Sequence, residues 1–131
     1  MLGMPAAVNR LIDALHNNEH IVIVGDFDAD GATSSALMVL ALTAMGFKKV
    51  RFLVPNRFDY GYGLTPEIVD LAAQNKPQLI ITVDNGISSV EGVAHALTLG
   101  IEVIITDHHL PGRVLPNAVA IVNPNQPRCE F

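Results

Sequence analysis

Short apolar runs alternate with longer amphipathic segments along the whole chain. Four runs rich in Val and Ile are bounded by Gly or polar residues, a pattern typical of buried parallel strands, and they cover residues 20–24, 50–54, 78–83 and 101–106. A fifth, shorter strand is expected at 118–122. Apolar residues at helical spacing predict helices at 5–18, 32–45, 66–75 and 89–99, and residues 55–64 are predicted to form a loop.

The residues at the predicted helix ends support these boundaries. Thr65 and Pro66 suit the N-cap and the first helical position, and Gly46 and Gly100 suit the positions just past a helix end. Strands that alternate with helices specify a parallel sheet with right-handed crossovers. We therefore predict an α/β fold, a Rossmann-like open sheet of about five mainly parallel strands covered by helices on both faces.

Acidic residues and histidines follow three of the predicted strands. The clusters are Asp26, Asp28 and Asp30 after the first strand, Asp84 after the third, and Asp107, His108 and His109 after the fourth. In an open α/β sheet, ligands gather outside the carboxyl ends of the strands. Carboxylates brought together there repel one another and lose hydration, and bound cations relieve that cost.

The first cluster alternates along the chain. In extended backbone, residues two apart point the same way, so Asp26, Asp28 and Asp30 are candidates for sharing an ion. Hard oxygen ligands suit Mg²⁺ or Mn²⁺. A solvated acidic loop is an alternative, and so is a calcium loop, although the downstream Glu that such a loop needs is absent.

The other two clusters differ in how specific they are. Asp84-Asn85-Gly86 is also a common turn, so its value lies in its position after a strand. In Asp107-His108-His109, one imidazole suits a metal while a carboxylate orients its other nitrogen, and the second imidazole suits a phosphoryl oxygen or a proton transfer. Two exposed loop histidines are the alternative to this site.

Composition limits the class of protein. The chain has 131 residues, half of them hydrophobic, which fits one domain with a real core. The formal net charge is -5, so the chain lacks the basic surface typical of a protein that binds duplex DNA. A nuclease stays possible, because catalytic carboxylates also lower its net charge. The chain shows no apolar run of membrane-spanning length and no secretory signal, and its single cysteine, Cys129, suits a reducing cytoplasm.

A set of motifs in a fixed order identifies a family. They are Val24–Thr33, Val54–Phe58, Gly61–Leu64, Thr82–Ser88, Thr106–Pro111 and Ile121–Pro124. With them the sequence resembles the DHH phosphoesterase superfamily, named for the triplet at 107–109, from about residue 8 to residue 131. Within that family the motif sequences are similar to those of the bacterial exonucleases that are specific for single-stranded DNA.

The resemblance implies a role for each site residue. Asp28 and Asp30 correspond to the metal-binding pair of the first motif, with Asp26 close by, and Asp84 corresponds to a carboxylate shared between two metals. His108 corresponds to a metal ligand, His109 to a residue that faces the scissile phosphate, and Asp107 to an orienter of the imidazoles. From its position after the second strand, Arg57 is a further candidate for phosphate binding, with a solvated loop Arg as the alternative.

The resemblance also implies an activity. We expect two-metal phosphodiester hydrolysis with Mn²⁺ or Mg²⁺, in a 5′-to-3′ exonuclease of DNA repair and recombination that acts on single-stranded DNA. Single-strand-binding protein and a helicase are expected partners of the full-length parent, without a membrane. The family's next metal-binding Asp, its second DHH-associated domain and an oligonucleotide-binding fold lie downstream of residues 1–131, so we expect this part of the catalytic domain to be weakly active or inactive.

Other functions stay open at this point. One is a different DHH phosphoesterase that hydrolyses oligonucleotides or cyclic dinucleotides. Another is a receiver-like, Mg²⁺-binding phospho-acceptor module, although no Lys follows Lys76 to serve it. A dinucleotide-binding fold lacks its Gly-x-Gly-x-x-Gly fingerprint here. A non-catalytic piece that folds only with the rest of a longer chain is the last alternative.

Overall fold

The computed structural model describes residues 1–131, with the exception of the Arg57 side chain. Helices and strands alternate along the chain, as the sequence predicts. Their order is α1 (Met4–His16), β1 (Ile21–Gly25), α2 (Ala29–Ala44), β2 (Val50–Leu53), α3 (Arg57–Tyr60), α4 (Pro66–Ala73), β3 (Leu79–Val83), α5 (Val90–Thr98), β4 (Glu102–Thr106) and β5 (Ala120–Val122).

The strands form a single parallel sheet in the order β2-β1-β3-β4-β5. Every residue of β1 and β3 is buried, and so are the three central residues of β4. Strands covered on both faces need apolar residues at every position, which explains their continuous Val and Ile runs. The predicted fold class is confirmed.

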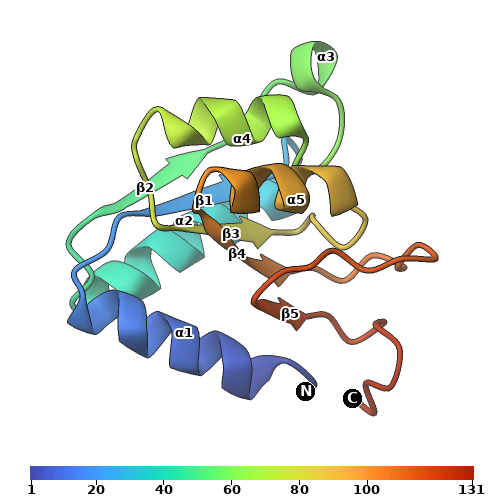
Figure 1. Cartoon of the computed structure of the whole chain (residues 1–131), viewed down its shortest axis with the longest axis horizontal. Helices are drawn as coiled ribbons and strands as arrows, with labels where there is room; N and C mark the ends of the chain where they lie inside the picture. The colour runs from blue at the N-terminus through green and yellow to red at the C-terminus, as the bar shows by residue number, and fades with distance from the viewer.

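Helices cover both faces of the sheet (Figure 1). On one face, Ala14 of α1 and Leu42 of α2 pack against alternate strand residues such as Ile81. On the other face, Ile68 of α4 and Val93 of α5 belong to the second core cluster. Because successive strand residues point to opposite faces, each strand supplies both cores.

The helix after β1 begins at Ala29, earlier than the predicted residue 32. The Asp28 side chain accepts a hydrogen bond from the Gly31 backbone N–H at 2.8 Å and so caps the first turn. Asp30 therefore belongs to the first turn of α2, and the extended backbone assumed for residues 26–30 is wrong at this residue.

The segment 55–64, predicted as a loop, contains the short helix α3. The Asn56 carbonyl accepts hydrogen bonds from the backbone N–H groups of Asp59 and Tyr60, and the Asn56 side chain accepts one from Phe58 N–H at 2.9 Å. These local bonds stabilise one helical turn that apolar periodicity does not reveal.

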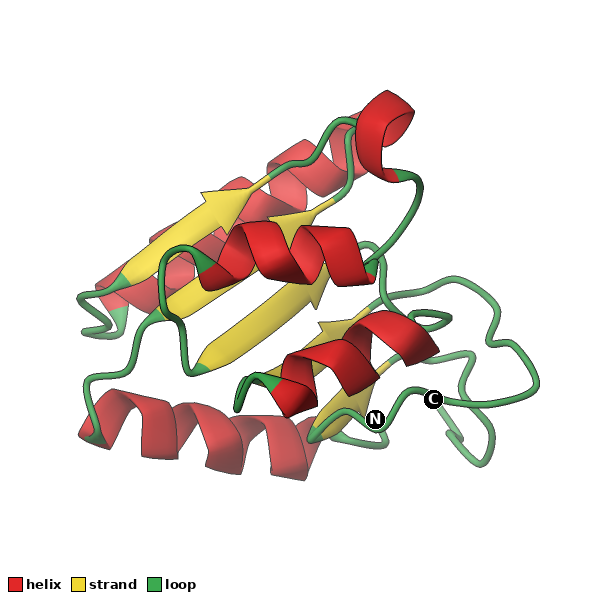
Figure 2. Cartoon of the chain, turned by 45° about the horizontal axis from the view of Figure 1, so that its top comes forward, coloured by secondary structure: helices red, strands yellow, loops and turns green.

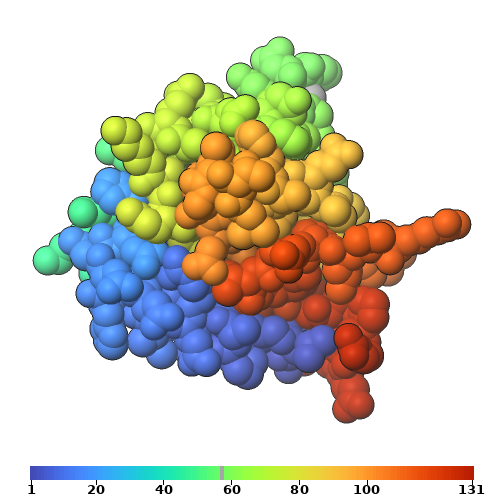
Figure 3. Space-filling view, viewed as in Figure 1, coloured from blue at the N-terminus to red at the C-terminus, as the bar shows by residue number. Residues whose placement is uncertain are grey.

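Both ends of the described chain lie beside β5. Figure 3 shows the N-terminal helix against the C-terminal segment, and a Cβ placed on Gly3 would lie only 1.9 Å from the Ile121 carbonyl oxygen. The loops that follow the strands gather at one end of the sheet (Figure 2). Among the described residues, no helix has both the length and the apolar character that crossing a membrane requires.

Candidate metal centre

The strands end in register, which brings four polar residues into a row. Gly25 pairs with Val83, Val83 with Thr106, and Thr106 with Val122. The residues that follow these positions are Asp26, Asp84, Asp107 and Asn123. Neighbouring parallel strands lie about 5 Å apart, so these side chains share one edge of the sheet.

Candidate ligand atoms come together in two groups at this edge. Asp26, Asp28 and Asp84 form one group, and Asp84, His108 and His109 form the other, with the ligand atoms of each group within 4.8 Å of one another. Asp84 is common to both groups. Carboxylates with an imidazole are a donor set that Mg²⁺ or Mn²⁺ accepts, so the residues fit the predicted cation.

Asp84 has an unusual backbone. Its φ of 62° lies in the left-handed region, which costs a residue with a Cβ about 1–3 kcal/mol, a cost that surrounding contacts must offset. Its N–H donates to the Thr106 carbonyl at 3.1 Å. The buried Asn85 side chain donates to the carbonyls of Val24 and Val83 at 3.1 and 2.9 Å, which ties the turn to β1.

The two histidines contact different carboxylates. His108 Nε2 lies 2.9 Å from Asp84 Oδ1, and 65% of the His108 side chain is exposed. His109 Nδ1 lies 2.6 Å from Asp107 Oδ1, and its ring packs edge-on to Tyr62. The Tyr62 hydroxyl lies 3.2 Å from His109 Nδ1 and 3.3 Å from His109 Nε2. The ring centroids of the two histidines are 4.6 Å apart.

Asp107 is buried and belongs to neither ligand group among the described residues. Only 1% of its side chain is exposed. It accepts hydrogen bonds from the backbone N–H groups of Ile87, His108 and His109, in addition to its contact with the His109 ring. These contacts tie Asp107 to the backbone of both histidines and to the ring of His109, and its orienting role stays a prediction.

Two pKa values are displaced at this edge. Burial raises the pKa of the Asp84 carboxyl, with a further rise from the charge of Asp28, while its bond with His108 acts in the opposite direction. The hydrogen bond with Asp107 raises the pKa of His109. A site that disfavours the ionised form of Asp84 is one in which a cation would be stabilising.

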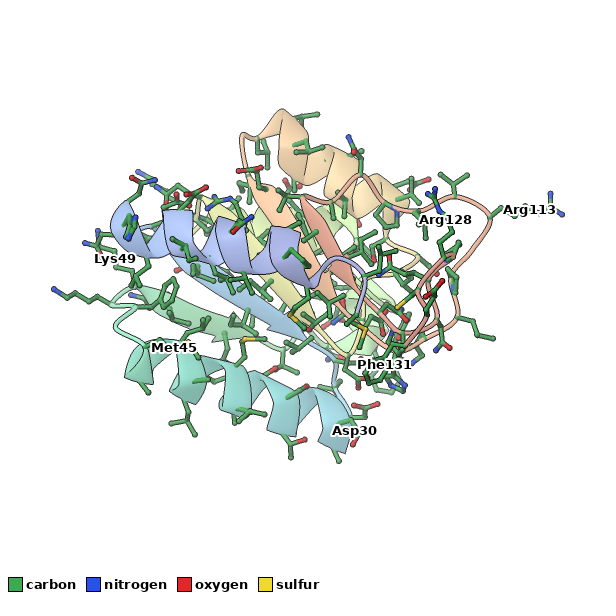
Figure 4. All side chains as sticks on the ribbon, turned by 90° about the horizontal axis from the view of Figure 1, so that it is seen from below. Asp30, Met45, Lys49, Arg113, Arg128 and Phe131 are labelled. Atoms are coloured by element: carbon green, nitrogen blue, oxygen red, sulfur yellow. The ribbon has the colours of Figure 1, made fainter. Side chains whose placement is uncertain are left out.

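Two hollows open at this edge of the sheet. One, of about 750 Å³, is lined by Asp26, Asp28, Tyr62, Asp107, His109 and residues 86–92, among others. The other, of about 650 Å³, lies beside α2 and includes Asp30, Asp84 and His108 together with apolar residues such as Leu37 and Val122. Figure 4 shows Asp30 at the end of α2 opposite Met45.

The predicted site residues are therefore partly brought together. Asp26, Asp28, Asp84, His108 and His109 contribute to the ligand groups. Asp30 belongs to neither group among the described residues, and it lines the second hollow together with Asp84 and His108.

The substrate-binding prediction for the Arg57 side chain lies outside the described residues.

The sequence reasoning gave no role to Asn85, Asn123 and Asn125. A signal for Asn123 was present, because it follows β5 as the acids follow the other strands.

Comparison with known proteins identifies relatives of this arrangement. The model of the DHH family, N-terminal domain, matches residues 20–130. The single-stranded-DNA-specific exonuclease RecJ of Salmonella typhimurium is 60% identical over 129 residues, which are 98% of this chain and 22% of that protein. RecJ of Bacillus subtilis is 44% identical over 131 residues, 100% of this chain and 16% of that protein. The chain thus spans about a fifth of the length of the curated relatives it matches.

Solved structures show the same architecture. A crystal structure of exonuclease RecJ bound to manganese superposes with a TM-score of 0.87 at 36% identity, over 98% of this chain and 33% of that one. The structure of RecJ from Thermus thermophilus in complex with Mn²⁺ superposes with a TM-score of 0.80 at 33% identity, over 98% of this chain and 18% of that one. Together with the ordered motifs and the family match over residues 20–130, these likenesses establish that the chain belongs to the DHH family.

Proposed function

We propose that this chain forms part of the catalytic domain of a metal-dependent phosphodiesterase, a 5′-to-3′ exonuclease for single-stranded DNA like the RecJ proteins it resembles. The observation that carries the proposal is the shared position of Asp84 in two adjoining ligand groups. A carboxylate common to two groups suits a pair of metal ions about 4 Å apart, the arrangement that serves in-line displacement at phosphorus.

The residues divide between two metal positions. Asp26, Asp28 and Asp84 would hold one ion, and Asp84 with His108 would hold the other, with Asp30 near it in the second hollow. Mn²⁺ or Mg²⁺ fits this mixture of oxygen and nitrogen donors, and two RecJ structures are described as bound to manganese. Two such ions lower the pKa of a water nucleophile and neutralise charge that develops on the phosphate oxygens.

His109 would contact the substrate phosphate. Asp107 binds its Nδ1, so Nε2 is the ring nitrogen that this carboxylate leaves for another partner. The ring lines the larger hollow, where the Tyr62 hydroxyl lies 3.2 Å from Nδ1 and 3.3 Å from Nε2. An imidazole held in this way donates a hydrogen bond or a proton to a phosphoryl oxygen. The raised pKa of His109 favours the protonated form that such donation needs.

The proposed substrate is single-stranded DNA, with single-strand-binding protein and a helicase as partners of a longer parent protein in the cytoplasm. Because the net charge of -5 repels the phosphates of DNA, attraction of the DNA backbone must come from the bound metal ions or from further polypeptide. Because the relatives are several times longer than this chain, we expect the 131 residues alone to bind Mn²⁺ and to degrade DNA weakly or not at all.

The test measures metal binding and activity separately. Mn²⁺ should raise the melting temperature of the wild-type chain, Asp84→Ala should abolish the rise, and Asp13→Ala, at an exposed carboxylate remote from the site, should preserve it. For activity, this chain would replace the matching segment of the Salmonella relative, and release of nucleotides from single-stranded DNA, an oligoribonucleotide and a cyclic dinucleotide would be compared. Absence of a Mn²⁺ shift, or a chimera that prefers either of the other two substrates, would contradict the proposal.

A further inference from the structure

Side chains bind every backbone polar group of the His108–His109 dipeptide. On one side, Asp107 Oδ1 accepts hydrogen bonds from the N–H groups of His108 and His109, at 2.8 and 3.2 Å. On the other side, Asn123 Nδ2 donates to the His109 carbonyl at 3.0 Å, and Asn125 Nδ2 donates to the His108 carbonyl. The backbone between the two imidazoles is thus held from both directions.

Asn123 is the buried member of this second pair. Its exposed fraction is 0%, and its place after β5 is the register equivalent of Asp107 after β4. Its Oδ1 accepts a hydrogen bond from Asn125 N–H at 2.7 Å while its Nδ2 binds the histidine carbonyl. Because one partner is a donor and the other an acceptor, only one orientation of the carboxamide satisfies both, so the contact is rigid.

Packing holds the imidazole rings only in part, through the edge-on contact of His109 with Tyr62 and the contact of the two rings with each other. The His108 side chain is 65% exposed and the His109 side chain 44% exposed. A ring on an exposed side chain keeps a defined direction only if its backbone is fixed and its ring nitrogens have partners. Small displacements of a ligand or a catalytic group weaken metal binding and catalysis, so the backbone clamp bears directly on the site.

We propose that Asn123, assisted by Asn125, is a positioning residue that sets the direction of the His108 and His109 imidazoles through the backbone carbonyls of the dipeptide. This inference rests on the proposed metal-dependent function of the site. Both polar atoms of the buried Asn123 side chain bind backbone groups, namely the His109 carbonyl and the Asn125 N–H. It acts on the ligands from the β5 end, as Asp107 acts on them from the β4 end.

Three variants test the proposal. Asn123→Asp keeps the shape and the acceptor for Asn125 N–H but replaces the donor to His109 by an oxygen. Its added negative charge alone would attract a cation, so weaker binding would not be a charge effect. Asn125→Ala removes only the bond to His108 at an exposed position, which protects the fold. Gln126→Leu is the matched control, because buried Gln126 donates to the carbonyls of Leu2 and Ile121 but not to the histidines.

Two measurements separate positioning from stability. Melting temperature in EDTA reports on the fold, and the electron paramagnetic resonance signal of free Mn²⁺ gives the dissociation constant. We expect Asn123→Asp to weaken Mn²⁺ binding at least tenfold, about 1.4 kcal/mol, and Asn125→Ala to weaken it severalfold. Gln126→Leu should lower the melting temperature while leaving the dissociation constant within twofold of wild type.

The inference would be overturned if Asn125→Ala, and Asn123→Asp where it folds, bound Mn²⁺ with the same affinity as the wild type. So would a loss of affinity in Gln126→Leu that matches its loss of stability, since the clamp would then be only structural. If the wild-type chain binds no Mn²⁺, the proposed function fails by itself. Nitrogen-15 spectra of the imidazoles in the metal-free chain then decide the inference: unchanged His108 and His109 ring signals in Asn125→Ala reject it, and shifted signals support it.

Discussion

Replacing Gly31 by Ala perturbs the acidic motif without removing any acid. Gly31 lies in the first turn of α2 directly beneath the backbone of Asp26. A Cβ at this position would lie 2.2 Å from the Asp26 carbonyl oxygen, 2.6 Å from its carbonyl carbon and 2.7 Å from its nitrogen. Real Cβ atoms essentially never approach closer than 3.0 Å, so the Asp26 backbone must move away by several tenths of an ångström.

The magnitude follows from two opposed effects. Alanine favours a helix over glycine by about 0.5–1 kcal/mol, and this effect stabilises the variant. Overpacking a close contact with backbone costs typically about 1–3 kcal/mol, and none of the three contacts involves a flexible side chain. The difference spans about 0 to 2.5 kcal/mol, and the 2.2 Å approach to rigid backbone favours the upper part of that range, so we expect a net loss of about 1–2 kcal/mol. We also expect a smaller rise in melting temperature with Mn²⁺, because Asp26 and Asp28 are displaced from Asp84.

Urea denaturation in EDTA gives the stability, and thermal melting with and without Mn²⁺ gives the effect on the site. A loss of 1 kcal/mol corresponds to roughly 4 °C for a chain of this size. Gly112→Ala is the control, because a Cβ at Gly112 meets no atom within 4 Å and should change stability by less than about 0.5 kcal/mol. A Gly31→Ala variant as stable as wild type, with a full Mn²⁺ response, would refute the reasoning from close approach.

Two further predictions concern charge. The pKa of His109 is raised by Asp107, so this pair adds stability that is present below pH 6.5 and is lost as the pH rises through the folded-state pKa. In EDTA, the free energy of unfolding should fall as the pH rises above 6.5. His109→Gln should flatten this slope in urea titrations at several pH values, and an unchanged slope would contradict the pairing. Arg10 binds Glu19 at 2.6 Å and Glu102 at 2.9 Å, and only 10% of its side chain is exposed. Arg10→Met should therefore lower the free energy of unfolding by about 2–3 kcal/mol. A loss below about 0.5 kcal/mol in the same assay would show that the ion pairs are weak.

The fold was predictable because the sheet is buried on both faces. Residues 79–83 and 103–105 are buried and apolar at nearly every position, so these strands can be recognised in the sequence. Helix-boundary signals, such as Thr65-Pro66 at a start and Gly46 at an end, place the neighbouring helices. The acids after the strands indicate a shared edge from the sequence alone, because the carboxyl ends of parallel strands coincide. Register and topology confirm that edge.

The remaining features depend on hydrogen bonds that no periodicity encodes. Asp28 caps α2 and pulls Asp30 into the helix, which the alternation of the motif concealed. Asn56 nucleates α3 by the same kind of local bond. The contact of Asn123 with the His109 carbonyl joins residues 14 positions apart, and its significance requires knowing that β4 and β5 are neighbours.

Each strand end that builds the site combines a buried polar residue with a more exposed one. Asp26, Asn85 and Asp107 are buried, with exposed fractions of 7%, 1% and 8%, and each hydrogen-bonds to backbone groups. Their neighbours Asp28 and His108 are exposed. A buried polar group is inexpensive only when the protein satisfies it, whereas an exposed carboxylate or imidazole keeps its capacity for an incoming ligand. The division implies that substitutions at the buried positions lower stability and metal affinity together, while substitutions at the exposed positions lower affinity with little loss of stability.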